Sequence, residues 1–209
     1  MSWHFIFLFS MTVFIASIIP GPSMLLALTH GMQYGARRTA ASAMGNVAVT
    51  LLQASVSIAG LGTIFIASEI IFQAVRWIGA AYLIYLGISI LCSSDLVLTP
   101  NRAKRDAGKK PLTKMFFQAA FVTAGNPKAI LFFTAVYPQF IQPELAFVSQ
   151  SCILLGITAL IAFSCFMLYA AGGQKIVSIF STAATGKIIK NIIGTSFIGA
   201  GIGLAASQK

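Results

Sequence analysis

Two short segments of the chain combine helix-breaking residues with groups that can bind a small charged molecule. They are Pro20-Gly21-Pro22-Ser23 and Asn126-Pro127-Lys128. A proline at the first position of a helix is followed by free backbone N–H groups, which attract a carboxylate. Lysine supplies a cation, and the asparagine carbonyl can accept a hydrogen bond from an ammonium group. The two segments together therefore predict a site for a molecule that carries both charges.

Both segments lie in long apolar stretches. Of the 209 residues, 57% are hydrophobic and 9% are charged, which is more apolar surface than one water-soluble core can bury. A bilayer core needs about 20 apolar residues of helix. Six stretches meet this length, so we expect a membrane protein that crosses the bilayer at roughly 5–28, 40–67, 70–92, 115–140, 147–171 and 188–206.

We expect an all-α fold of six transmembrane helices in two inverted three-helix repeats. The first repeat is 1–92, the second is 115–209, and 93–114 is a basic cytoplasmic linker. Three helices is an odd number, so the second repeat enters the membrane in the opposite orientation. Pairing Pro22 with Pro127 aligns PGPSMLLALT with GNPKAILFFT without a gap. Interrupted helices at matching places in inverted repeats point to the binding site of a transporter.

The positive charges predict the orientation in the membrane. All lysines and arginines except Arg76, Lys128 and Lys209 fall between spans one and two, three and four, or five and six, or at the ends of those spans. By the positive-inside rule those loops are cytoplasmic and both termini are outside. The apolar N-terminus resembles a signal peptide, but it has no basic start and five further apolar stretches follow it, so we interpret it as a retained span. We expect a multi-pass protein of the bacterial cytoplasmic (inner) membrane.

The prolines and Lys128 each have a simpler explanation beside the functional one. Proline costs a helix interior about 3 kcal/mol, and in lipid such a break survives where protein or a wet cavity satisfies the freed backbone. The prolines can instead serve only to kink helices for packing. Lys128 lies near the middle of its span, where a charge costs on the order of 3 kcal/mol. It either snorkels to the interface or faces a cavity, as a cation for an anionic ligand or as a titrating group.

Further polar and small residues mark helix faces. Asn46, Thr50, Gln53 and Ser57 follow the spacing of one helical stripe, which either lines a path or ties helices together. In the sixth span, Gly199 and Gly203, with Gly194 and Ala200 nearby, predict close helix packing within the protomer or across a homodimer.

Other classes of function find little support in the sequence. The basic residues form no helix or aromatic platform typical of nucleic-acid binding. Cys92, Cys152 and Cys165 lie in or beside apolar stretches, as core residues do. His4 and His30 are not at metal-ligand spacing from other ligands. We therefore expect no metal, no cofactor, no nucleic-acid partner and no enzymatic activity.

The segments PGPSMLLALTHGMQYGARRTAASAMGN and TAGNPKAILFFTAVYPQF resemble the LysE/RhtB family of bacterial amino-acid exporters, in its homoserine, threonine and leucine branch. The resemblance covers nearly the whole chain and implies an exporter of amino acids or similar metabolites driven by the proton motive force. The family's motif positions correspond to Pro20, Gly21, Pro22, Gly31, Gly35, Arg37, Gly45, Asn126, Pro127, Lys128, Pro138, Gln139 and Phe140.

The chain departs from this family at two places. Many relatives have a Gly-Asp pair where this chain has Val49 and Thr50, and an acid in the fifth span near Phe163. Neither span of this chain contains a carboxylate. We therefore expect Lys128, rather than an acid, to be the group that titrates.

The leading hypothesis is a secondary transporter that exports small neutral amino acids, with membrane lipid around it. The alternative is a non-transporting membrane scaffold or assembly protein, in which the helix breaks serve only assembly. Lys128 and the N–H groups after Pro22 are expected to meet the substrate carboxylate, and broken-end carbonyls, Asn126 and Gln53 its ammonium group. The expected substrate-binding residues are Pro22, Ser23, Asn46, Gln53, Asn126, Pro127 and Lys128, and the expected helix-break residues are Pro20, Gly21, Pro22, Asn126 and Pro127.

Overall fold

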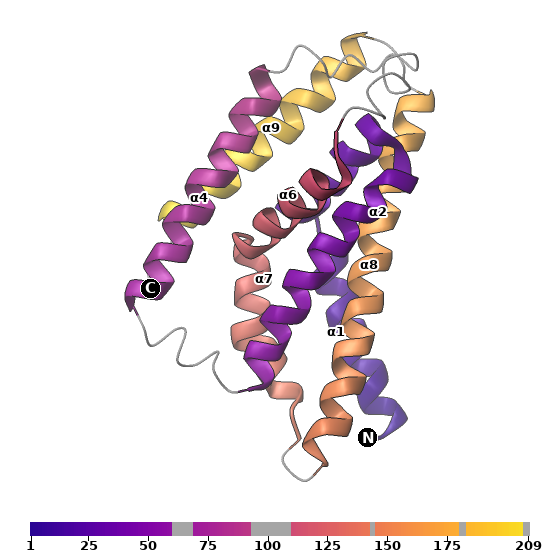
Figure 1. Cartoon of the computed structure of the whole chain (residues 1–209), viewed down its shortest axis with the longest axis vertical. Coiled ribbons are helices and arrows are strands. Elements are labelled where there is room, and N and C mark those ends of the chain that lie inside the picture. The colour runs from indigo at the N-terminus through magenta and orange to yellow at the C-terminus, as the bar shows by residue number, and fades with distance from the viewer. Residues whose placement is uncertain (60–68, 93–109, 143–144, 180–182, 207–209) are drawn as a thin grey trace.

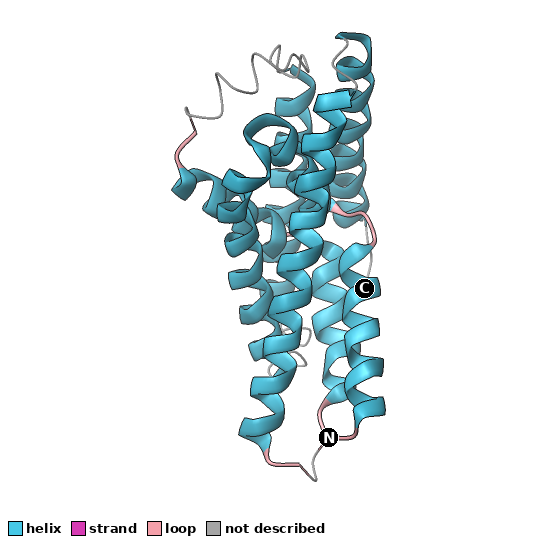
Figure 2. Cartoon of the chain, turned by 90° about the vertical axis from the view of Figure 1, so that its right-hand side faces the viewer, coloured by secondary structure: helices cyan, strands magenta, loops and turns pink. Residues whose placement is uncertain are grey.

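The computed structural model describes residues 1–59, 69–92, 110–142, 145–179 and 183–206. Every regular element within these residues is a helix (Figure 2), which confirms the all-α part of the predicted fold. The end of the second predicted span and most of the linker lie outside the described residues. The elements are α1 Trp3–Ile18, α2 Pro22–Ile58, α4 Glu69–Cys92, α6 Leu112–Ala124, α7 Pro127–Leu131, the π-helical turn η1 Phe132–Val136, the 3-10 turn η2 Tyr137–Phe140, α8 Phe147–Ile179 and α9 Ala183–Ala206.

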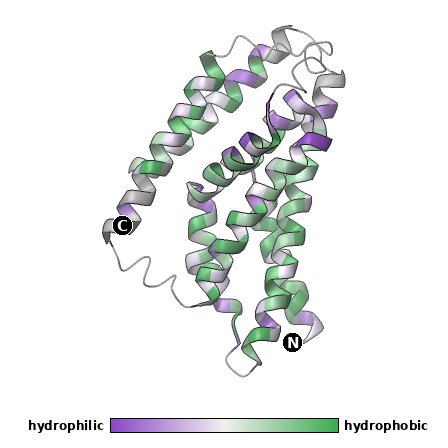
Figure 3. Cartoon of the chain, in the orientation of Figure 1, coloured by the Kyte–Doolittle hydropathy of each residue, from purple (hydrophilic) through white to green (hydrophobic). Residues whose placement is uncertain are grey.

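Two of these helices are long and apolar enough to cross a membrane. By length and composition they are Pro22–Ile58 and Phe147–Lys175. Leu112–Ala124 and Lys128–Phe140 would form a third span if their bend of 63° lies within one crossing. Apolar residues cover long stretches of α2 and α8 (Figure 3), as a protein that faces lipid requires.

The main helix contacts join the first half of the chain to the second half. Helix α2 packs against α6 and α8, α1 packs against α8, and α4 pairs with α9 (Figure 1). The larger apolar cluster accordingly draws Leu26 and Leu83 from the first half and Phe166 and Phe197 from the second. The two halves therefore share one core.

Glycines allow the closest of these helix approaches. A Cβ atom at Gly31 would overlap the carbonyl oxygen of Ala170 in α8, and one at Gly45 would overlap the carbonyl oxygen of Phe116 in α6. Any side chain at either position would force the helices apart. Close packing thus explains two of the glycines that the family resemblance singled out.

Gly35 folds α2 back on itself. Its backbone angles, φ 77° and ψ 159°, belong to a region that is essentially restricted to glycine. The chain reverses direction at Gly35, as the contact between residues on either side of it shows: His30 Nδ1 lies 2.7 Å from Ser42 Oγ. The Ala36 N–H freed by the turn donates to Gln174 Oε1 of α8 at 2.7 Å. Helix α2 is therefore a hairpin with arms 22–34 and 36–58, and the first two predicted spans are joined by this sharp turn.

The small residues of α9 divide between two faces. Gly194 and Gly201 face α4, where added Cβ atoms would crowd Leu91 and Ile84. A Cβ atom at Gly199 or Gly203 would meet nothing within 4 Å. Close packing within the protomer thus uses Gly194 and Gly201, and a homodimer through Gly199 and Gly203 stays a prediction.

We expect Gly35→Ala to lower the free energy of unfolding by about 1–3 kcal/mol, because alanine must adopt a backbone conformation that its Cβ disfavours. The measurement is the apparent melting temperature of the detergent-purified protein. Gly156→Ala is the matched control, because a Cβ there meets nothing within 4 Å and alanine favours a helix interior. Equal stability of the two variants would contradict the role of Gly35.

Candidate functional site

The two predicted helix breaks face each other, with Ile19 and Pro20 of the first break exposed and Asn126 of the second buried. The first separates α1 from α2 at residues 19–21, and the second separates α6 from α7 at residues 125–126. A side chain at Gly21 would lie 3.6 Å from Lys128 Nζ and 3.9 Å from Asn126 Nδ2. Each break therefore lies within reach of the polar groups of the other.

The end of α1 is held by side chains from the second half of the chain. Lys128 Nζ donates to the Ile19 carbonyl oxygen at 2.6 Å, and the Tyr169 hydroxyl donates to the Ile18 carbonyl oxygen at 2.9 Å. Because the helix ends here, no N–H group of a following turn can donate to these carbonyls. A cation is also favourable at the negative end of a helix. This contact gives Lys128 a protein partner that the sequence did not reveal.

The starts of α2 and α7 differ in how they are capped. Both begin with a proline, Pro22 and Pro127. Asn126 Oδ1 accepts from the Lys128 N–H at 3.2 Å and so caps α7. The residue before α2 is Gly21, and no described side chain caps this helix. The positive end of α2 therefore remains open to an anionic group.

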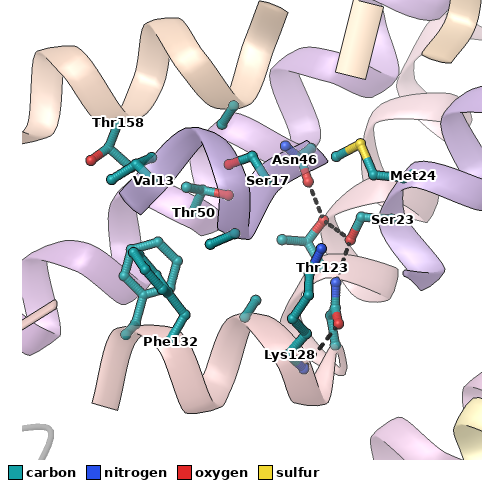
Figure 4. Close-up of a pocket in the computed structure, with 15 residues that line it drawn as sticks. Val13, Ser17, Ser23, Met24, Asn46, Thr50, Thr123, Lys128, Phe132 and Thr158 are labelled. Carbon is teal, nitrogen blue, oxygen red and sulfur yellow. Dashed lines mark hydrogen bonds between the residues drawn. The ribbon is translucent and has the colours of Figure 1, made fainter. Parts of the chain in front are cut away.

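A chain of buried hydrogen bonds links the two halves at this point (Figure 4). Asn126 Nδ2 donates to Ser23 Oγ at 3.0 Å, and Thr123 Oγ1 donates to Asn46 Oδ1 at 2.8 Å. The two hydroxyls lie 3.3 Å apart. Because Thr123 has already given its single hydroxyl proton to Asn46, Ser23 donates to Thr123. All the donors therefore point from Asn126 toward Asn46, which fixes the orientation of both amides.

A cavity of about 50 Å³ adjoins this network, which is enough room for water. Its polar wall contains Ser23, Asn46, Thr50, Asn126 and Lys128. The opposite wall is largely apolar (Figure 4) and is formed by Val13, Ala129, Phe132, Phe133 and Ala162. A polar wall opposite an apolar one suits a small amphipathic molecule. A ligand larger than a few waters would need the surrounding helices to separate.

The structure brings together most of the predicted binding residues. Ser23, Asn46, Asn126 and Lys128 line the cavity, and Pro22 and Pro127 begin the helices beside it. Gln53 is not among the lining residues. Its Oε1 is buried and has no hydrogen-bond partner among the described residues. Of the predicted polar stripe on α2, Asn46 and Thr50 line the cavity, whereas Gln53 and Ser57 do not.

Three residues of the site were missed by the sequence analysis. Thr123 carries the hydrogen-bond chain, Tyr169 holds the end of α1, and Thr158 lines the cavity from α8. Thr123 is a polar residue just before the break, in an otherwise apolar segment, and this position in the sequence could have identified it. Tyr169 and Thr158 lie far away in the sequence, so only the packing of α8 reveals them.

Comparisons with known proteins found a matching family model and similar proteins. The family model for the LysE type translocator matches residues 14–208. The chain is 30% identical over 210 residues to a homoserine/homoserine lactone efflux protein of Salmonella typhi, with 99% of this chain and 97% of the relative covered. It is 27% identical over 193 residues to a leucine efflux protein of Klebsiella pneumoniae, with 91% and 90% covered. No solved structure matches the chain.

Replacing Thr123 by the isosteric valine should destabilise the protein by about 1–3 kcal/mol, because Asn46 Oδ1 then loses its donor in a buried place. Thermal unfolding in detergent measures this change. Thr195→Val is the matched control, because Thr195 is exposed and bonds only to its own helix. If both variants melt at the wild-type temperature, the buried chain does not contribute to stability.

Proposed function

The chain belongs to the LysE type translocator family, and on that premise we propose that it exports small neutral amino acids across the cytoplasmic membrane. Relatives named as homoserine and leucine efflux proteins support this substrate class. The observation that carries the proposal is the cavity between two facing helix breaks, because such a place offers both an anion site and carbonyl acceptors.

The substrate carboxylate is received at the open start of α2 and by Lys128. The Ser23 and Met24 N–H groups lie in the first turn of this helix, and both residues line the cavity. Asn46 Oδ1 and the Ile19 carbonyl are acceptors for the substrate ammonium group. The apolar wall with Phe132 and Phe133 takes a small aliphatic side chain.

Lys128 links substrate binding to a helix movement in this proposal. Its ammonium group donates to the carbonyl oxygen of Ile19, the residue that directly follows α1. A carboxylate that enters the cavity competes with Ile19 for that ammonium group, because a charged acceptor forms the stronger hydrogen bond. Release of Ile19 frees the end of α1, and the cavity can then enlarge.

The membrane architecture we propose has six spans in two inverted repeats. Each repeat begins with an interrupted span, α1 with the first arm of α2, and α6 with α7. The orientation is supported by Arg38, which donates to the Lys110 carbonyl oxygen at 2.9 Å, so these two basic segments share one end of the molecule. That end is cytoplasmic by the positive-inside rule, and both termini are then outside.

We also propose that the proton motive force drives export. Among the described residues that line the cavity, Lys128 alone carries a readily ionisable side chain. A proton gained or lost there would alter both the substrate site and the bond to Ile19. The competing hypothesis is a membrane scaffold, in which Lys128 only secures the end of α1.

The decisive measurement is transport in proteoliposomes with an imposed pH gradient and a panel of labelled amino acids. We expect gradient-dependent movement of neutral amino acids. Lys128→Met should reduce the rate at least about tenfold, because a charge-assisted hydrogen bond to the carboxylate is lost. In cells fed with dipeptides, expression of the wild-type protein should lower the accumulated pool of the same amino acid.

Lys187→Met is the control, because Lys187 is exposed and is not one of the residues that line the cavity. The scaffold hypothesis predicts that Lys128→Met keeps function and gains stability, because desolvation of a charge is relieved. Unchanged pools for every amino acid on expression of the wild type would refute the proposed substrate class.

Reporter fusions test the proposed orientation. A green fluorescent protein at the C-terminus should be dark, and alkaline phosphatase at the same place should be active, because the C-terminus is outside. Fusions within residues 93–109 should give the reverse pattern. Fluorescence from the C-terminal fusion would show that the positive charges do not set the orientation of this chain.

A further inference from the structure

A second and larger cleft lies between α4 and α6, away from the cavity at the helix breaks. Its volume is about 470 Å³. Helices α4 and α6 make few contacts with each other, and the pair α4–α9 lies beside the rest of the helices (Figure 1). None of its lining residues belongs to the cavity described above.

The lining changes from polar to apolar along both helices. The polar end holds Lys110, Thr113 and Lys114 at the start of α6, with Ser89 near the end of α4. One and two turns further along α6 the lining residues are Phe117 and Phe121, which are 58% and 61% exposed. Tyr82, Tyr85 and Leu86 form the facing wall on α4. The cleft is therefore amphipathic along its length and open to the surroundings of the helices.

Among the described residues, no acidic side chain balances the positive charge at the polar end of the cleft. Of the four acidic residues of the chain, only Glu69 lies in the described part, at the opposite end of α4. Neither Lys110 nor Lys114 has a carboxylate partner among the described residues. Burial lowers the pKa of Lys110, and the nearby Lys114 lowers it further. An anion between the two ammonium groups would relieve both effects.

We propose that this cleft binds an anionic phospholipid. The phosphate lies between Lys110 and Lys114, with the Thr113 and Ser89 hydroxyls as additional donors, and an acyl chain follows Phe117 and Phe121. Basic pockets between helices on the cytoplasmic side suit anionic head groups, and tyrosine side chains suit the interface. A small soluble anion would use the lysines but leave the exposed aromatic wall without a partner.

A lipid in this position would join parts of the protein that otherwise touch little. Lys110 also bonds Gln118 Oε1, which lies 3.2 Å from His30 Nε2, and its ammonium group lies 5.6 Å from the centre of the Tyr34 ring. The head group thus contacts a network that reaches the first arm of α2. The lipid site does not depend on amino-acid export, so the two proposals can fail separately.

Native mass spectrometry of the detergent-purified full chain tests the proposal. The probes are phosphatidylglycerol and phosphatidylethanolamine with the same acyl chains, mixed in equal amounts. We expect preferential retention of phosphatidylglycerol. Lys110→Gln with Lys114→Gln should weaken its binding at least about tenfold, and Phe121→Ala should weaken it about fivefold through loss of apolar contact.

Three controls make the result decisive. Lys175→Gln with Lys187→Gln removes the same charge elsewhere and should leave binding unchanged. Lys110→Arg with Lys114→Arg keeps the charge and should retain the lipid, and glycerol phosphate should compete poorly. Equal binding of the two lipids, equal losses in the two double Gln variants, or full competition by glycerol phosphate would each overturn the proposal. Because the competition uses the wild-type protein, it remains informative if a variant fails to fold.

Discussion

The structure depends on satisfying backbone groups where helices are interrupted inside an apolar protein. In hydrocarbon no water is available to such groups, and each unsatisfied one is costly. This chain places two interruptions opposite each other. The carbonyl left open after α1 is bonded by Lys128 from the second interruption, and Asn126 both caps its own helix and donates to Ser23 of the first. Each helix break therefore supplies hydrogen-bond partners for polar groups of the other break.

The same constraint explains why the site is polar on one wall only. Breaking two helices concentrates donors, acceptors and one cation at a single depth, while the intact helices and η1 supply the apolar wall with Phe132 and Phe133. The open start of α2 is the part of this arrangement that no described side chain satisfies. In the proposed mechanism, stability and binding draw on the same atoms, because a ligand that competes for Lys128 breaks the bond that holds the end of α1.

The sequence predicted the features that follow from local chemistry. Proline in an apolar stretch indicates a helix break, so Pro22 and Pro127 identified both helix starts. Features that need the packed fold were missed. Gly35 was a motif position, but its backbone angles, and hence the sharp turn of α2, could not be read from the motif. The role of Tyr169 depends on where α8 lies. Gln53 lies on the same helix face as Asn46, but the spacing of residues along a helix does not show how far the cavity extends, and Gln53 lies beyond it.

The pairing of α4 with α9 has a consequence for biosynthesis. Leu83 and Ala80 of α4 are fully buried beside Phe197 and Ile193 of α9, yet the whole stretch 93–182 separates the two helices in the chain. Helix α4 leaves the ribosome long before its partner exists, and its apolar face must meanwhile be covered by lipid or by an insertion factor. This face of α4 is therefore covered by protein only after α9 has entered the bilayer, and a chain that lacks α9 would expose it to quality-control proteases.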